Sequence, residues 1–180
     1  ASLWGFLHNE IYQNDSMTLA VSGARCQKLP RQITHISNKT IIDIACGKDF
    51  SFVLDENYYA FSFGNNTHCQ LAREKTVGIM PVPQIAEYLS NIRKIVCGWM
   101  HGMCLTKTGE VYIWGNPYYE YDNGFEDINK PLNMELEGVL DIASGFNHFA
   151  AISNKHGFNE LYTWGMNEYV NEYNIGSTWL

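Results

Sequence analysis

The chain has 180 residues, of which 46% are hydrophobic and 17% are charged, and its formal net charge is -7. This composition is typical of a folded globular chain, and no stretch approaches the ~18 consecutive apolar residues of a membrane-spanning helix. The scattered acids and the lack of a Lys/Arg block argue against direct binding to nucleic acid. The first residues lack the basic start and apolar run of a signal peptide, so we expect a cytoplasmic or nuclear location and no membrane contact.

A short apolar strand that ends in an aromatic residue and glycine occurs four times along the chain. It reads "SLWG" at 2–5, "YAFSFGN" at 59–65, "VYIWGN" at 111–116 and "LYTWGMN" at 161–167. A second glycine precedes each of the last three strands, at Gly47, Gly98 and Gly145. The positions recur every 47 to 51 residues, which is the signature of a stacked or radial repeat.

Each repeat is predicted to be a strand, a turn, a strand, a turn and a strand. Alternation between apolar and polar residues is weak, as expected when each small sheet is packed between two neighbours. We therefore predict an all-β fold, a β-propeller with about three full blades and a partial blade at both ends. The predicted units within this single domain (1–180) are 1–40 (partial), 41–91, 92–138, 139–174 and a closing strand at 175–180.

Most of the repeated residues have a structural explanation. His101 and His148 occupy equivalent positions, and the first full unit has Phe50 there, so we expect these histidines to pack or to bind backbone rather than to catalyse. The predicted structural residues of the repeat are Gly47, Gly64, Gly98, His101, Trp114, Gly115, Gly145, His148, Trp164 and Gly165.

The five cysteines are an odd number without paired close spacing, which favours reduced thiols over a disulfide framework. His101 with Cys104, and His68 with Cys69, could each form half of a zinc site, but no second pair with ligand spacing follows. The sequence also lacks a glycine-rich phosphate loop, a Ser-His-Asp spacing and a recurrent carboxylate pair. We predict no metal, no cofactor and no covalent catalysis.

The candidate protein-binding residues lie where the repeat does not require them. Residues 116–130 read "NPYYEYDNGFEDINK", and the mixture of aromatic and acidic side chains is typical of a contact surface. The alternative is a loop that folds back over its blade. A weaker copy follows the next unit, and Trp99 follows the Gly98 turn. The candidates are Trp99, Tyr118, Tyr119, Glu120, Tyr121, Asp122, Phe125, Glu126, Asp127, Tyr169, Glu172 and Tyr173.

The combined pattern of a Cys-Gly turn, a histidine three residues later, a hairpin turn and a closing Trp-Gly-x-Asn resembles the regulator of chromosome condensation repeat. The resemblance covers about three units, 41–167, and implies a seven-bladed propeller. "GNNTHCQL", "CGKDFSFVLDE" and "GSTWL" are similar to the alpha-tubulin suppressor branch of this family in yeasts. That branch implies a small zinc-ribbon protein as partner, in diphthamide synthesis and Elongator-dependent tRNA modification. The alternative that the family implies is a guanine-nucleotide exchange factor for a Ran-like GTPase.

Seven blades of about fifty residues need about 350 residues, so this chain supplies about half of a ring. An open half would expose two apolar blade faces. We expect this sequence to be the carboxyl-terminal half of a longer protein that supplies the rest of the ring; the alternative is that a second chain completes the propeller.

Overall fold

The computed structural model describes residues 30, 32–74, 78–117 and 126–166. They form eleven strands and one short 3-10 helix, η2 (Thr34–Ile36). The first sheet consists of β1 (Ile41–Cys46), β2 (Phe50–Asp55), β3 (Ala60–Asn65) and β4 (Ile79–Ile85). The second consists of β5 (Ile92–Cys97), β6 (His101–Thr106), β7 (Val111–Gly115) and β8 (Ile128–Asn133). The third consists of β9 (Val139–Ser144), β10 (His148–Ser153) and β11 (Glu160–Gly165).

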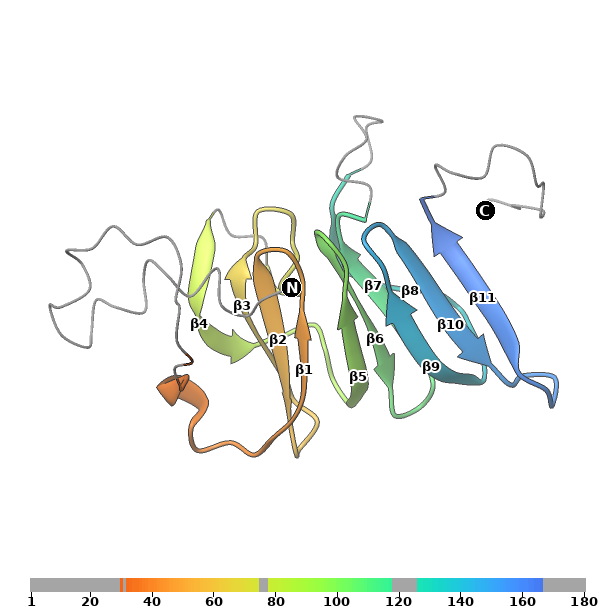
Figure 1. Cartoon of the computed structure of the whole chain (residues 1–180), viewed down its shortest axis with the longest axis horizontal. Helices are drawn as coiled ribbons and strands as arrows, with labels where there is room; N and C mark the ends of the chain where they lie inside the picture. The colour runs from red at the N-terminus through yellow and green to blue at the C-terminus, as the bar shows by residue number, and fades with distance from the viewer. Residues whose placement is uncertain (1–29, 31, 75–77, 118–125, 167–180) are drawn as a thin grey trace, which may run out of the picture.

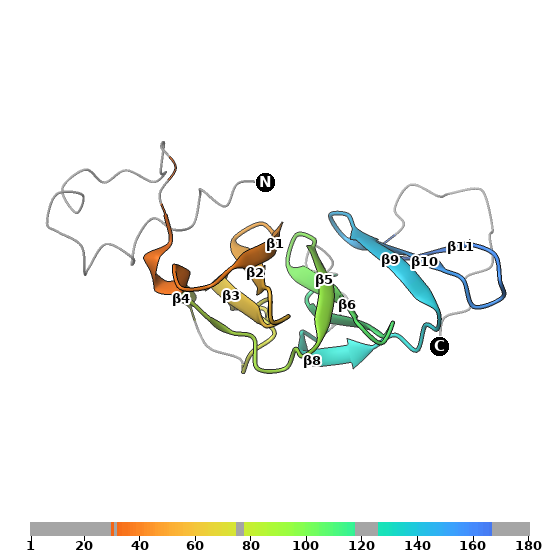
Figure 2. The same ribbon diagram turned by 90° about the horizontal axis from the view of Figure 1, so that it is seen from below.

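The three sheets, called blades 1, 2 and 3 below, stand side by side in chain order (Figure 1). All strand pairs within a blade are antiparallel, so each blade is a meander. The view from below shows the first strands β1, β5 and β9 lying along the same side of the row (Figure 2). This arrangement is a partial β-propeller, which confirms the predicted fold class.

The sequence pattern predicted three strands for each unit, but blades 1 and 2 each have a fourth. β4 contains Pro81 and Pro83, and β8 contains Pro131. Proline cannot donate a hydrogen bond to a sheet, and it is confined to edges, where one side of the strand needs no partner. The fourth strands are the outer edges of their sheets, which is why a pattern of apolar alternation missed them.

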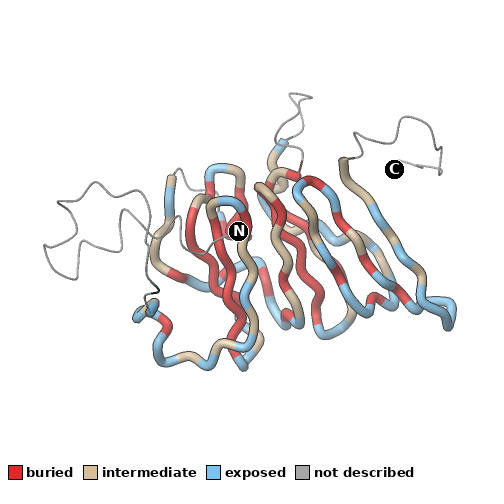
Figure 3. The backbone as a smooth tube through the Cα atoms, in the orientation of Figure 1, coloured by how far each residue is buried: buried red, intermediate tan, exposed pale blue. Residues whose placement is uncertain are grey.

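The core lies between blades, and the second strands of blades 1 and 2 are covered on both faces (Figure 3). Every residue of β2 and β6 is buried. One cluster joins blades 1 and 2 and contains Phe52, Ile95 and Trp114, and a second joins blades 2 and 3 and contains Met103, Val139 and Phe149. Burial on both faces explains why apolar and polar residues do not alternate regularly in these strands.

The predicted unit 1–40 lies outside the described residues except for positions 30 and 32–40, and the predicted closing strand 175–180 lies outside them entirely. The unit boundaries therefore stay predictions. In the described part of the chain, no helix is long and apolar enough to cross a membrane.

Candidate protein-interaction surface

One end of each blade carries the turn between its first and second strands, and this end is called the loop face. The turns lie at the upper end of the blades in Figure 1. Each begins at a repeat glycine, whose backbone N–H donates to the residue three positions later: Gly47 to Phe50, Gly98 to His101, and Gly145 to His148. A Cβ added at Gly98 would overlap the His101 ring, so the side chain three residues on takes the space that glycine leaves open.

The third strand of each blade ends at the same face. The N–H of Asn65 donates to the Asp49 carbonyl at 2.8 Å, that of Asn116 to Met100 at 2.8 Å, and that of Met166 to Asn147 at 2.9 Å. The loops that leave the third strands therefore start beside the first turns. Both sets of predicted contact loops begin on the loop face.

The first turns of consecutive blades are hydrogen-bonded to each other. The Lys48 N–H donates to the Trp99 carbonyl at 3.2 Å, and the Trp99 N–H donates to the Phe146 carbonyl at 3.0 Å. Their side chains stack in the same order. The Lys48 Nζ lies 4.3 Å from the centre of the Trp99 ring, and the Trp99 and Phe146 rings are 4.4 Å apart with 32° between their planes. Lys48, Trp99 and Phe146 are called the aromatic row below.

The aromatic row is accessible to solvent. Lys48 is exposed, Trp99 is half-buried, and Phe146 keeps 43% of its surface exposed. The sequence singled out Trp99 but not Lys48 or Phe146 as contact residues. The signal that identifies all three is their shared position, one residue after a repeat glycine.

His101 lies below this surface and is fully buried. Its Nε2 is 2.9 Å from the Ser144 hydroxyl of blade 3, and its ring centre is 4.5 Å from that of Phe149. Burial, and then the nearby His148, lower the pKa of His101 to about 4. The imidazole is therefore neutral at pH 7 and joins two blades, whereas the equivalent His148 is exposed.

Trp114 is the largest fully buried side chain among the described residues, and it is hydrogen-bonded to a loop of blade 1. Its indole Nε1 donates to the Gln70 carbonyl at 2.8 Å, and the Gln70 Nε2 lies 3.4 Å from the Met100 sulfur. The equivalent Trp164 stacks on Phe149, with ring centres 5.3 Å apart. Within the described ranges, neither the Trp164 Nε1 nor the Asn147 Oδ1 has a hydrogen-bond partner.

Most of the predicted acidic and aromatic contact residues lie outside the described residues. These are Tyr118, Tyr119, Glu120, Tyr121, Asp122, Phe125, Tyr169, Glu172 and Tyr173. Of the remaining three, Trp99 belongs to the aromatic row, Glu126 is exposed, and the Asp127 side chain is only 14% exposed. The Asp127 Oδ1 lies 3.1 Å from the His68 Nδ1 and accepts from the Asn116 Nδ2 at 3.0 Å. Asp127 thus links loops of blades 1 and 2, and its predicted docking role would have to compete with these contacts.

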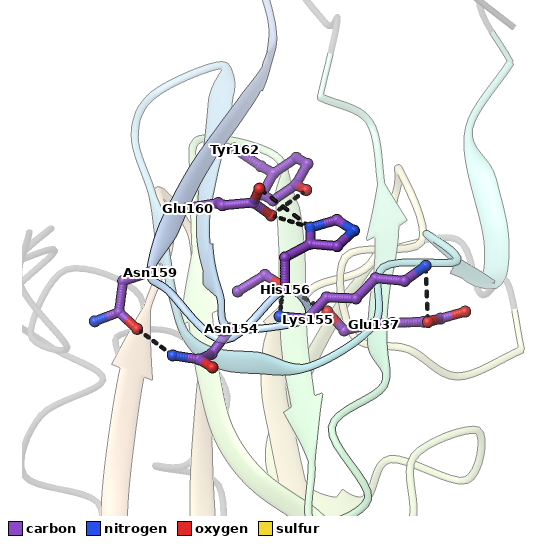
Figure 4. A network of polar contacts seen from close by, with 8 residues as sticks. Glu137, Asn154, Lys155, His156, Asn159, Glu160 and Tyr162 are labelled. Carbon is purple, nitrogen blue, oxygen red and sulfur yellow. Dashed lines mark hydrogen bonds and ion pairs between the residues drawn. The ribbon is translucent and has the colours of Figure 1, made fainter.

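The opposite end of blade 3 carries a polar network around the β10–β11 hairpin (Figure 4). The Lys155 Nζ lies 2.8 Å from Glu137, and the Tyr162 hydroxyl donates to Glu160 at 2.9 Å. His156 also contacts Glu160, at 3.1 Å. Hydrogen bonds from their partners lower the pKa of both glutamates. The Glu137 and Lys155 side chains are exposed, so this network lacks the apolar setting in which a proton transfer would be favoured.

Two features of the described residues bear on metal binding and on cysteine chemistry. Among them, no three His, Cys, Asp or Glu side chains lie together as a metal site. Cys104 lines a cavity of about 170 Å³ beside Tyr88, Asn91 and Tyr112, but burial raises the pKa of its thiol to about 12. A thiol is a weak nucleophile, so this cavity does not have the chemistry of a cysteine enzyme.

Comparison with known proteins agrees with this geometry. Two sequence profiles, both described as the regulator of chromosome condensation (RCC1) repeat, match residues 13–54 and 59–105, and residues 92–120. Together they cover more than half of the chain. The chain belongs to the RCC1 repeat family.

RCC1 repeats also relate this chain to larger proteins. It is 29% identical over 151 residues to the human E3 ubiquitin-protein ligase HERC2, and 26% identical over 158 residues to the human probable E3 ubiquitin-protein ligase HERC4. The alignments include 79% and 83% of this chain but only 3% and 14% of those proteins. The similarity therefore concerns the repeats and not the remainder of those ligases.

Solved structures show the same RCC1 architecture. Prp20p of Saccharomyces cerevisiae, described with its binding to Gsp1p and histones, superimposes with a TM-score of 0.64 at 26% identity. The match covers 79% of this chain and 34% of Prp20p. Human WBSCR16 gives a TM-score of 0.65 at 22% identity, over 82% of this chain and 40% of that protein, which supports the fold alone.

Proposed function

We propose that this chain is the protein-binding part of an RCC1-type propeller, and that it acts by holding a partner on its loop face without covalent catalysis. The aromatic row carries this proposal. Three blades place a long or aromatic side chain at the same position, and these side chains stack into one accessible strip. Aromatic side chains on a rigid scaffold are the usual energetic centres of protein interfaces.

The partner that we propose is a small zinc-ribbon protein, in diphthamide synthesis and Elongator-dependent tRNA modification. This rests on the short stretches "GNNTHCQL" and "CGKDFSFVLDE", which are similar to the yeast alpha-tubulin suppressor branch. The first stretch includes Gln70, whose carbonyl accepts the hydrogen bond from Trp114 of blade 2. The second stretch spans the first turn and β2 of blade 1. The loop residues Tyr118, Tyr119 and Tyr121 are proposed to contribute to the same surface.

Affinity capture with a matched pair of variants tests the interaction. Trp99→Ala removes the centre of the aromatic row, and Tyr59→Ala removes an exposed ring from the opposite end of blade 1. We expect Trp99→Ala to weaken capture of the partner at least about tenfold, as for an interface hot spot, and Tyr59→Ala to leave it unchanged. Mass spectrometry identifies the captured protein. Equal capture by both variants would exclude the aromatic row as the docking site.

A second candidate function is nucleotide exchange on a Ran-like GTPase, which the similarity to Prp20p and its binding to Gsp1p favours. An exchange factor stabilises the nucleotide-free GTPase, so it must accelerate nucleotide release at catalytic amounts. Release of a fluorescent nucleotide from a Ran-like GTPase is the measurement. If the chain accelerates release and Trp99→Ala abolishes the acceleration, the exchange function would be supported and the scaffold function rejected. If the chain does not accelerate release, exchange by this chain would be excluded.

A further inference from the structure

We propose that the cavity beside Cys104, called the hairpin cavity below, binds one neutral sugar ring. It opens next to the β6–β7 turn, at the end of the blades opposite the loop face (Figure 1). A ligand in it would therefore not compete with a partner docked on the loop face.

The hairpin cavity lies at a junction that the structure describes on both sides. One wall is the linker between β4 and β5, residues 88–91, and the other is formed by β6, β7 and their turn. The buried Leu89, Ile92 and Cys104 also line it, and all three belong to the core cluster between blades 1 and 2. The cavity is therefore not a product of the open side of either outer blade.

A hydrogen-bonded carboxylate lies on the hairpin wall. The Glu110 carboxylate accepts from the Thr108 hydroxyl at 2.9 Å and from the Tyr112 hydroxyl at 3.4 Å. A carboxylate has about four acceptor positions, so Glu110 can accept further hydrogen bonds from a ligand. On the linker wall, the exposed Ser90 hydroxyl and Asn91 amide can each donate or accept. A ligand between the walls thus finds hydrogen-bonding groups on two sides.

The same space also has apolar surface. The rings of Tyr88 and Tyr112 line it together with the buried Leu89, Ile92 and Cys104. A sugar ring is amphipathic in the same way, because its C–H groups pack against aromatic rings while its hydroxyl groups donate and accept at the edge. Such mixed lining, mostly apolar with a few convergent polar groups, is typical of small-molecule sites.

The charges around the cavity favour a neutral ligand. Among the described residues that line it, Glu110 alone is charged, so an anion would be repelled. Ammonium groups already lie nearby. The Lys130 Nζ is 5.9 Å from the centre of the Tyr88 ring, and the exposed Lys107 donates its backbone N–H to the Asn91 carbonyl. A cationic ligand would have to compete with both lysines.

The volume of the cavity limits the ligand to one ring. Pockets for drug-sized ligands have ~300–1,000 Å³, whereas this one has about 170 Å³. Two common sources present a single ring with several hydroxyl groups, a hexose and the ribose of a nucleoside. The probes below distinguish them.

A titration followed by NMR of the backbone amides tests the proposal. The probes are methyl β-D-glucopyranoside, methyl β-D-galactopyranoside, methyl α-D-mannopyranoside and methyl β-D-ribofuranoside. We expect at least one of them to shift the signals of Ser90, Asn91 and Glu110, with saturation at millimolar concentration, as for so small a ligand. Preference for the furanoside would indicate a ribose, and preference for a pyranoside a hexose. No shift with any probe would overturn the proposal.

A matched compound tests the role of the hydroxyl groups. Tetrahydropyran-2-methanol keeps a six-membered ring but has a single hydroxyl. We expect it to bind at least about fivefold more weakly than the best glycoside, because it lacks most of the groups that donate to Glu110. Equal binding would show an apolar cavity without sugar recognition.

Two carboxylate variants locate the site. Glu110→Gln keeps the shape of the side chain but removes its charge, and we expect it to bind the best glycoside about fivefold more weakly. Glu110 is exposed, so this variant should fold. Glu160→Gln is the matched control, because Glu160 likewise accepts from a tyrosine two residues later, Tyr162, but lies in blade 3. Unchanged binding by Glu110→Gln, or an equal loss in both variants, would contradict the proposed site.

Charged analogues test the choice of a neutral ligand. The two analogues carry an ammonium or a carboxylate at the exocyclic carbon of the best pyranoside, or of methyl β-D-glucopyranoside if the furanoside binds best. We expect neither to bind more tightly than the neutral glycoside. Tighter binding of the ammonium analogue that Glu110→Gln abolishes would make the ligand an amine and overturn the proposed class.

Discussion

The junction of blades 1 and 2 and the junction of blades 2 and 3 have the same geometry but different chemistry. At the first, Phe50 fills the position three residues after the repeat glycine, with 2% of its surface exposed. At the second, His101 fills the equivalent position and contacts the Ser144 hydroxyl. The loop after β3 also stabilises the first junction, because the Gln70 carbonyl accepts from Trp114 and the Gln70 side chain contacts the Met100 sulfur. The position three residues after the repeat glycine thus requires a ring that fits beside the glycine, and either phenylalanine or histidine can occupy it.

The largest expected effect comes from breaking the first junction. Trp114→Ala removes a fully buried indole and leaves the Gln70 carbonyl without its donor, so we expect a loss of about 3–5 kcal/mol in the free energy of unfolding. Trp164→Ala is the matched change in blade 3, where the indole is only half-buried, and should cost less. Urea denaturation measures both. Equal losses would show that the two junctions are energetically alike despite their different contacts.

His101 should make the stability of the second junction depend on pH. The pKa of His101 is about 4 in the folded chain and about 6.5 when unfolded. Above pH 6.5 both states are neutral and the full stability is present. As the pH falls from 6.5 to 4, the unfolded chain binds a proton that the folded chain excludes, so stability falls by about 3 kcal/mol.

Replacing His101 with the residue of the first junction isolates this effect. The variant His101→Phe should lose the part of the pH dependence between pH 6.5 and 4 that His101 contributes, as measured by urea denaturation at a series of pH values. An unchanged pH profile would show that another group titrates there, and would remove the chemical distinction between the two junctions.

The smallest expected effect concerns a surface ion pair of the second junction. The Lys94 Nζ lies 2.6 Å from the Asp141 Oδ1, and both side chains are more than a third exposed. Hydrogen bonding to Lys94 lowers the pKa of Asp141, but exposed pairs contribute little. We expect Asp141→Ala to cost at most about 1 kcal/mol, and less at high salt. A larger loss in thermal denaturation would show that the second junction depends on this pair more than its exposure indicates.

The sequence was sufficient to predict the propeller but not every strand in it. The repeat glycines and the aromatic-glycine strand ends mark the first three strands of each blade, because these signals are local. The fourth strands β4 and β8 were not predicted, since edge strands need neither apolar alternation nor a full set of backbone donors.

The candidate site was predicted in part. Trp99 was identified, whereas Lys48 and Phe146, which also directly follow repeat glycines, were not. Asp127 was identified by composition as a contact residue, yet its contact with His68 joins two loops that are 59 positions apart in sequence. Composition can indicate a surface, but it does not show which acids are already paired.

The sequence by itself determined the repeat, its period and the all-β fold, because each blade is specified by short-range turns and apolar strands. Only the tertiary structure decided which side chains meet across a junction, since these residues lie about fifty positions apart. The stacking of Lys48, Trp99 and Phe146 follows from the register between neighbouring blades, which the backbone hydrogen bonds of their first turns define. The neutral state of the His101 imidazole at pH 7 follows from burial against blade 3, which no local pattern encodes.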